Sequence, residues 1–180
     1  EETPINCFEF AKLVAETDLP AGVFNVLGGK GEVGGLLSSS SEVDMISFTG
    51  SIATGSCIQA ASAPNITKLN LELGGKAPAI VLNDANLDLA ANAIWNSRVI
   101  NTGQVCNCVE RVYVQRDIAD QFIEKVTALM QSTQYGDPSK MNDLHMGSLI
   151  NQQGLNKIDT QVKQAIEQGA KVVTGGNIAD

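Results

Sequence analysis

Strand-like and helix-like segments alternate along the chain, and this alternation constrains the fold more than any other feature. Short apolar or alternating runs predict strands, and apolar residues at helical spacing predict helices, with glycine or proline between them. Such alternation is typical of a parallel sheet flanked by helices, so we expect an α/β fold. Strands are expected at 23–27, 43–49, 68–73, 79–82, 109–115 and 170–174, and helices at 5–14, 36–37 and neighbours, 52–63, 87–99, 118–130 and 152–168.

Composition is that of a folded protein without a nucleic-acid or membrane surface. Hydrophobic residues make up 43% of the 180 residues and charged residues 18%, which argues against disorder. The net charge of −8 comes without any basic cluster, so nucleic acid is not an expected partner. No apolar run has the length of a membrane span, and no signal-peptide pattern opens the chain.

Cysteine and histidine usage narrows the chemistry. Cys7, Cys57, Cys106 and Cys108 lack the spacing of a disulfide framework, which favours a reducing, cytoplasmic location. Only the last two are close together, and they are closer than zinc-binding pairs usually are, so no metal site is expected. The single histidine, His145, lies in a polar connection and is expected to be structural or exposed.

Two junctions could hold a nucleotide. Residues 29–34 match G-x-G-x-x-G, but the acidic residue expected about 20 positions later is missing, so a simple glycine turn over 28–35 is favoured. At the second junction Ser51 follows a predicted strand and begins a predicted helix. Free N–H groups there suit an anion, although Ser51 could equally be only a helix cap. Asp117 is a similar N-cap candidate for the helix that follows it.

A third segment places a thiol in a polar setting. Cys106 lies in a glycine-containing stretch, 101–108, between a predicted helix and a predicted strand. A thiolate is a strong nucleophile even when only partly formed. No histidine is near in sequence, and Glu72, at the end of an alternating strand and before Gly74 and Gly75, is the natural candidate for a base.

Three motifs together resemble the aldehyde dehydrogenase superfamily. They are Phe-Thr-Gly-Ser at 48–51, Leu-Glu-Leu-Gly-Gly-Lys at 71–76 and Gly-Gln-Val-Cys at 103–106, in the order and at the spacing of that family. The resemblance covers nearly the whole chain. Within the family, residues 101–114 are most similar to the lactaldehyde and glycolaldehyde dehydrogenases.

The resemblance implies oxidation of a small-molecule aldehyde to a carboxylic acid with NAD, NADP being less favoured. Cys106 would attack the carbonyl, pass through a thiohemiacetal and a thioester, and be released when Glu72 activates water. Asn107 would line the aldehyde pocket. The residues that the resemblance assigns to the cofactor are Glu1 at the adenosine ribose, Gly31 and Gly35 in the glycine turn, Gly50 and Ser51 at the pyrophosphate, Leu73 at the nicotinamide amide, and Lys157.

The resemblance also implies a domain plan. Residues 1–73 would be the second half of a Rossmann-like NAD-binding domain, and residues 74–180 the first part of an α/β catalytic domain. The chain begins at Glu1 without Met and stops in a glycine turn, so we expect a truncated, central fragment of a homo-oligomeric enzyme, without activity of its own. Two alternatives remain at this stage: a non-catalytic nucleotide-binding or structural fragment, and a thiol hydrolase that uses Cys106 without a cofactor.

Overall fold

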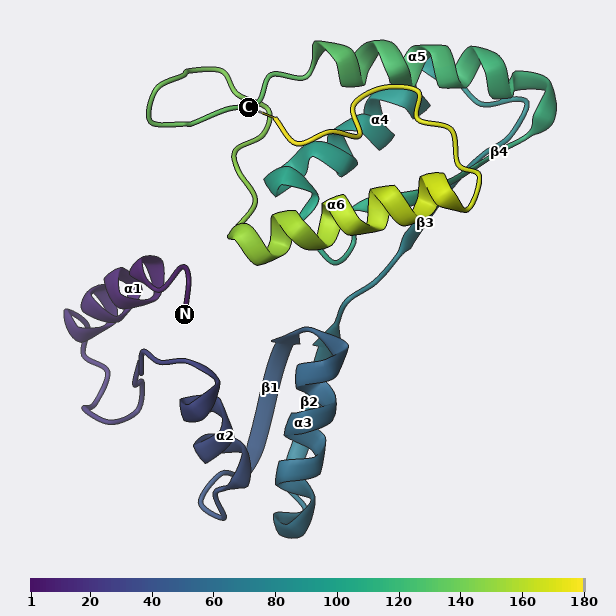
Figure 1. The fold of residues 1–180 in the computed structure, drawn as a ribbon. Helices are drawn as coiled ribbons and strands as arrows, with labels where there is room; N and C mark the ends of the chain where they lie inside the picture. Colours follow the sequence, from purple (N-terminus) through teal and green to yellow (C-terminus); the bar gives the residue numbers. More distant parts are fainter. Residues whose placement is uncertain (180) are drawn as a thin grey trace. The chain divides into compact units, whose positions relative to one another are not determined.

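The computed structural model describes residues 1–179 and divides into two compact units (Figure 1). The first unit is Glu1–Gly74 and the second begins at Gly75. Each unit is described by itself below.

The first unit is built around two parallel strands joined by a helix. β1 (Met45–Gly50) leads into α3 (Ile52–Ser62), and a short 3₁₀ turn, η1 (Ala63–Asn65), leads into β2 (Lys68–Leu73). The strands pair in register from Met45 opposite Lys68 to Gly50 opposite Leu73. The helices α1 (Ile5–Ala15) and α2 (Gly31–Ser39) precede them.

Packing of α3 against β2 depends on a glycine. Gly55 is buried, and a Cβ atom added there would lie 2.8 Å from Cδ2 of Leu73. The absence of a side chain therefore lets the first turn of α3 approach the end of β2 closely.

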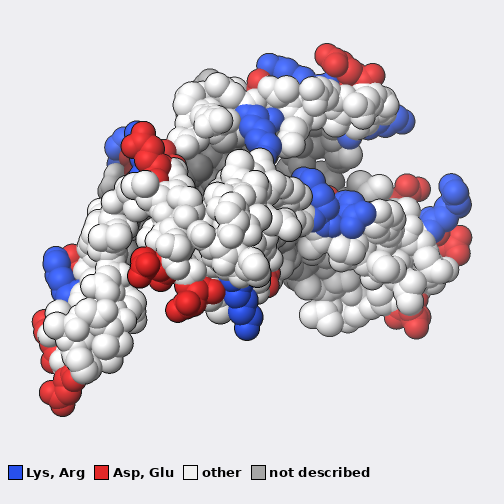
Figure 2. Space-filling view, turned by 90° about the horizontal axis from the view of Figure 1, so that it is seen from below, with Lys and Arg blue, Asp and Glu red and all other residues white. Residues whose placement is uncertain are grey.

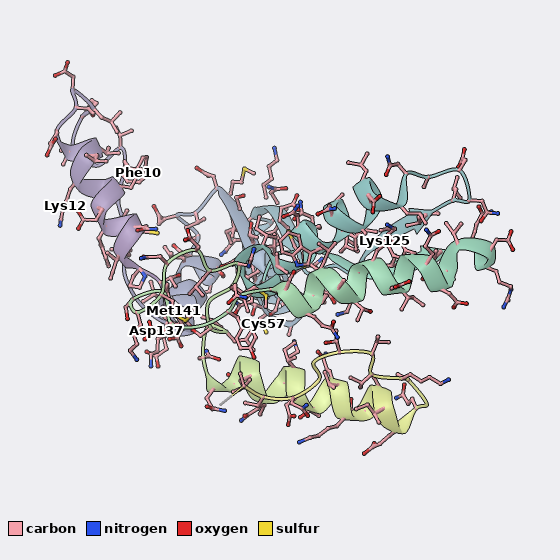
Figure 3. All side chains as sticks on the ribbon, turned by 90° about the horizontal axis from the view of Figure 1, so that it is seen from above. Phe10, Lys12, Cys57, Lys125, Asp137 and Met141 are labelled. Carbon is pink, nitrogen blue, oxygen red and sulfur yellow. The ribbon has the colours of Figure 1, made fainter. Side chains whose placement is uncertain are left out.

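The second unit contains another pair of parallel strands covered by helices. Its elements are β3 (Ala77–Val81), α4 (Leu87–Val99), the 3₁₀ turn η2 (Ile100–Gly103), β4 (Val109–Val114), the 3₁₀ turn η3 (Arg116–Ile118), α5 (Ala119–Ser132) and α6 (Gln152–Glu167). The core consists of Val81, Ala91, Ile94 and Phe122, which brings β3, α4 and α5 together. Lys125 of α5, labelled in Figure 3, pairs with Asp88 of α4 at 2.5 Å and supports the same packing.

The connection between α5 and α6 is fixed by polar and ring contacts. Trp95 donates from Nε1 to the buried Thr133 hydroxyl at 2.8 Å. His145 lies edge-on to the Trp95 ring and accepts a hydrogen bond at Nδ1 from the backbone N–H of Gln134, at 2.9 Å. The exposed histidine is thus a structural residue, as expected.

Two expected strands are wrong. Residues 23–27 and 170–174 form no strand in the described part of the chain, Val23 and Phe24 lie in a bend, and Val23, Leu27 and Val173 are exposed. An extended run becomes a strand only when a neighbouring strand supplies hydrogen bonds. Residues 1–179 form the β1–β2 and β3–β4 pairs but provide no partner strand for these two segments.

Two local expectations also need correction. The predicted turn over 28–35 ends early, because α2 already begins at Gly31 and includes Gly35. Asp117 does not cap α5, because the chain first makes the η3 turn and the helix begins two residues later. The Asp117 carboxylate instead accepts a hydrogen bond from Nδ2 of Asn83 at 3.0 Å.

Charged side chains are dispersed on the face seen in Figure 2, with acidic and basic groups interspersed. Within residues 1–179, no helix is both long and apolar enough to cross a bilayer. The same residues contain no group of three or more His, Cys, Asp or Glu side chains placed to hold a metal ion.

Candidate functional site

The carboxyl ends of β1 and β2 bring four of the predicted site residues together. The parallel register places Gly50 opposite Leu73, and Thr49 opposite Glu72. Ser51 follows Gly50 directly and begins α3. In α/β sheets, ligands bind outside the carboxyl ends of the strands, so this edge is the candidate cofactor surface of the first unit.

The start of α3 combines the capping hydroxyl of Ser51 with backbone N–H groups that could donate hydrogen bonds to a ligand. The Ser51 hydroxyl accepts from the Thr54 N–H at 3.1 Å and lies 2.8 Å from the Thr54 hydroxyl. The N–H groups of Ile52 and Ala53, in the first turn, have no acceptor within the helix. The ring of Phe48 lies against Gly50, where a Cβ atom would overlap it. These features fit a phosphate-bearing cofactor, because N–H groups at a helix N-terminus favour anions.

Glu72 is presented to solvent by the alternation of β2. Its neighbours Leu71 and Leu73 are half-buried, whereas Glu72 is exposed. Among residues 1–179, no hydrogen bond or ion pair to its side chain is present. The carboxylate is therefore available to act on water.

Cys106 occupies the tip of a tight turn in the second unit. The N–H of Cys108 donates to the carbonyl of Val105 at 3.2 Å, which makes Cys106 and Asn107 the two central residues of a β-turn. Both central residues are exposed, and all four cysteines are free thiols.

Three residues in left-handed conformations precede this turn. Asn101, Thr102 and Gly103 have φ values of 47°, 58° and 74°. For Asn101 and Thr102 such backbone costs about 1–3 kcal/mol each, so the surroundings must hold it in place. Strain of this kind clusters at functional sites.

Hydrogen bonds supply that support. Gln104 donates from its backbone N–H and from Nε2 to the carbonyl of Asn101, at 3.1 and 3.0 Å. Its Oε1 accepts from the N–H of Ile150 at 2.9 Å, and Thr102 donates to the carbonyl of Gly147 at 3.2 Å. The segment before α6 therefore holds the strained residues in place.

Gly75 touches the nucleophile candidate through its backbone. A Cβ atom added at Gly75 would lie 2.9 Å from the carbonyl oxygen of Cys106, whereas one at Gly74 would meet nothing within 4 Å. The second glycine of the Gly-Gly pair is thus the one required by close approach.

We predict that Gly75→Ala destabilises the full chain by about 1–3 kcal/mol and lowers kcat, because the Cys106 carbonyl has to move. Gly74→Ala is the matched control and is expected to be neutral, or slightly stabilising through a less flexible unfolded chain. Thermal unfolding and initial rates measure both effects. Equal behaviour of the two variants would contradict the prediction.

A charged cluster lies beside the Cys106 turn, and the sequence reading missed it. Arg98, near the end of α4, donates from a guanidinium N–H to the sulfur of Cys108 at 3.1 Å and lies 3.6 Å from Glu110. Glu110 also binds Lys76, the residue after Gly75. The hydrogen bond from Lys76, followed by the positive charges of Lys76 and Arg98, lowers the pKa of Glu110 below its ordinary value of 4.5. In the sequence, Lys76 is the last residue of one family motif, and Arg98 and Glu110 lie on either side of another.

The remaining predicted residues are Glu1, Gly31 and Gly35 in the first unit and Lys157 in the second. Glu1 is exposed and lines a pocket of about 260 Å³ with Gly28, Gly29 and other residues of α1 and the 26–29 loop. Gly31 and Gly35 are exposed on α2. Lys157 is exposed on α6. Glu72 and Cys106 belong to different units, so each is placed only within its own unit.

Comparisons of sequence and of structure with known proteins agree on one protein family. Residues 1–180 match the model of the aldehyde dehydrogenase family. The chain is 52% identical to lactaldehyde dehydrogenase of Escherichia coli strain K12, over its whole length and 38% of that protein. A solved structure of a lactaldehyde dehydrogenase superposes with a TM-score of 0.96 at 52% identity, covering 99% of this chain and 38% of that one. The expected α/β class and aldehyde dehydrogenase fold are thereby confirmed.

Two further solved structures carry cofactors. Betaine aldehyde dehydrogenase from Staphylococcus aureus, in complex with NAD⁺, has a TM-score of 0.93 at 36% identity, covering 99% of this chain and 35% of that one. A 3,6-anhydro-L-galactose dehydrogenase in complex with NADP has a TM-score of 0.93 at 38% identity, covering 99% of this chain and 37% of that one. The chain therefore spans well under half the length of the relatives it matches.

Proposed function

Because these 180 residues belong to the aldehyde dehydrogenase family, we propose that the full protein oxidises a small aldehyde to a carboxylic acid through Cys106. The observation that carries the proposal is the exposed thiol of Cys106 at the tip of a turn held by strained backbone and hydrogen bonds. Cys108, by contrast, is buried at 2% exposure, and the exposed Cys7 and Cys57 lie on helices and not at the tip of a turn.

Two side chains of this protein have chemical roles in the proposed reaction: the thiolate of Cys106 and the carboxylate of Glu72. The Cys106 thiolate forms a C–S bond with the aldehyde carbon, and the carbonyl oxygen takes up the negative charge. A bound nicotinamide cofactor supplies the acceptor for the hydride of that carbon. The resulting thioester on Cys106 is attacked by water, which passes a proton to Glu72, and breaking of the C–S bond releases the acid and the thiolate. Covalent capture replaces one difficult step with two easier ones.

NAD is the proposed cofactor, and Gly50, Ser51 and the start of α3 are the residues proposed to hold its phosphates. The free N–H groups of Ile52 and Ala53 support this role. Leu73, Gly31, Gly35 and Lys157 keep the cofactor roles that the resemblance implies. Solved relatives carry either NAD⁺ or NADP. Glu1 favours NAD if it meets the ribose, because a carboxylate repels the 2′-phosphate of NADP.

Two substitutions of Ser51 distinguish its role as a helix cap from a role in binding the cofactor phosphates. Ser51→Ala is expected to cost about 1 kcal/mol of stability through loss of the cap and to weaken cofactor binding. Ser51→Asp keeps a capping oxygen, so stability is expected to hold, but its negative charge opposes the phosphates and NAD affinity falls at least about tenfold. Calorimetric titration and thermal unfolding measure the two quantities. Undiminished NAD affinity in Ser51→Asp would leave the residue as a cap alone.

Lactaldehyde or glycolaldehyde is the proposed substrate, with Asn107 beside the nucleophile in the aldehyde pocket. The support is the 52% identity to a lactaldehyde dehydrogenase and the similarity over residues 101–114. The test is a panel of lactaldehyde, glycolaldehyde and betaine aldehyde, with the full chain and either NAD or NADP, read as reduced cofactor and as acid formed. A higher kcat/KM for betaine aldehyde would reject the assignment.

Calorimetric titration with NAD and an ester-hydrolysis assay, run beside this panel, test the alternatives. NAD binding without turnover of any aldehyde would favour a non-catalytic nucleotide-binding protein, and ester hydrolysis that ignores NAD would favour a thiol hydrolase. We further propose a cytoplasmic homo-oligomer for the full protein. Four free thiols support a reducing compartment, and the family resemblance supports the assembly.

A further inference from the structure

Arg98 contacts the chain on both sides of the turn that contains Cys106. On the side before the nucleophile, the guanidinium packs against Gly103, where a Cβ atom would overlap it. On the side after the nucleophile, it donates to the sulfur of Cys108 at 3.1 Å. One planar group therefore contacts the residues three before and two after Cys106.

Cys108 closes the contact between these two ends. Its buried thiol accepts from Arg98 and donates to the carbonyl of Gly103 at 3.2 Å. The Gly103 carbonyl comes directly after the two strained residues, so this bond pins the end of the left-handed run. Both hydrogen-bonding functions of the thiol are used, which gives Cys108 a structural task distinct from that of Cys106.

Arg98 is itself held in one orientation. Its side chain is 35% exposed and lies 3.6 Å from Glu110, which binds Lys76 on its other side. Lys76 follows Gly75, the residue whose backbone touches the Cys106 carbonyl. A chain of charges thus runs from α4 through β4 to the segment that contacts the nucleophile.

Resting on the proposed function, we infer that Arg98 is a positioning residue for Cys106. It acts on the backbone from Gly103 to Cys108 through its contacts with these two residues, and not through the thiol of Cys106 itself. A planar fork suits this task, because it can lie flat against Gly103 while donating sideways to sulfur. A lysine would keep the charge but lose the flat contact and the directed N–H.

The consequence is a specific kinetic signature in the full-length protein. Misplacing a reacting group by about 1 Å can cost about 10²-fold, so Arg98→Gln is expected to lower kcat by about 10²-fold. The KM for NAD should stay within about threefold, because Arg98 contacts Gly103, Cys108 and Glu110, none of which has a proposed cofactor role. Arg98→Lys is expected to recover part of the lost kcat, since it can still pair with Glu110.

The matched control is Arg116→Gln, which removes the same charge from an exposed arginine of η3. It is expected to leave kcat unchanged. Cys108→Ala removes the acceptor for Arg98 and should also lower kcat, whereas Cys108→Ser keeps both a donor and an acceptor and should retain most of it. The double variant Arg98→Gln with Cys108→Ala should be no slower than the worse single variant, because both changes break one network.

Hydrogen exchange measured by mass spectrometry reports on positioning without turnover. Arg98→Gln is expected to speed exchange of the Cys108 and Val109 N–H groups at least about tenfold and to leave α6 unchanged. Folded Arg98→Gln protein with kcat within about threefold of wild type, or additive losses in the double variant, would overturn the inference. If Cys106→Ala still oxidises aldehydes, the proposed function fails instead, and the exchange result still decides whether Arg98 holds the turn.

Discussion

Aldehyde oxidation by the full chain is expected to fall at least about 10⁴-fold when Cys106 is replaced by alanine, because the nucleophile of the covalent route is lost. The substitution lies at an exposed turn position, so stability should change by no more than about 0.5 kcal/mol. NAD binding, measured by calorimetry, should persist. This combination separates loss of chemistry from loss of fold.

Cys57→Ala is the matched control for that variant. Cys57 is also an exposed free thiol, on α3 in the first unit, and is labelled in Figure 3. Its removal should leave turnover intact, and alkylation of the protein should then still abolish activity through Cys106. Substantial turnover in Cys106→Ala would require another nucleophile and would reject the mechanism.

The second large effect is expected at Glu72. Glu72→Gln removes the base that activates water, so steady-state turnover should fall by about 10²–10⁴-fold while the hydride step proceeds. Reduced cofactor should therefore appear in a rapid burst of about one equivalent per Cys106, followed by a slow phase. Mass spectrometry of the quenched protein should find the acyl group on Cys106.

Glu42→Gln provides the charge-matched control, because Glu42 is an exposed acid of the same unit that precedes β1. Normal turnover is expected from it. A Glu72→Gln protein that turns over normally and accumulates no acylated Cys106 would show that another group activates the water.

The spacing of apolar residues within a segment predicted the strands and helices in which that spacing is regular. The strand at 68–73 and the helix at 87–99 begin and end where expected, because alternation and helical spacing are properties of the segment itself. The segments 23–27 and 170–174 are also rich in apolar residues but have no partner strand in the described residues, and the sequence of one segment does not specify its partner.

The turn around Cys106 has features that the sequence does not predict. Polar composition and a family motif pointed to Cys106 and Glu72, and those roles remain predictions. The residue types at 101 and 102 do not predict two successive left-handed residues, because asparagine tolerates that conformation but threonine, which is β-branched, rarely adopts it. Without that reversal, Arg98 would not be expected to reach both Gly103 and Cys108, so its contacts could be found only in three dimensions.

Thr102 makes the left-handed segment before Cys106 less stable. A β-branched residue at φ 58° opposes the conformation it occupies, and its hydroxyl bond to Gly147 offsets part of the penalty. Glycine would relax the backbone at this position but would also surrender the tether to the neighbouring segment. These two effects of glycine on stability oppose each other, and only the hydroxyl of threonine ties the left-handed segment to Gly147.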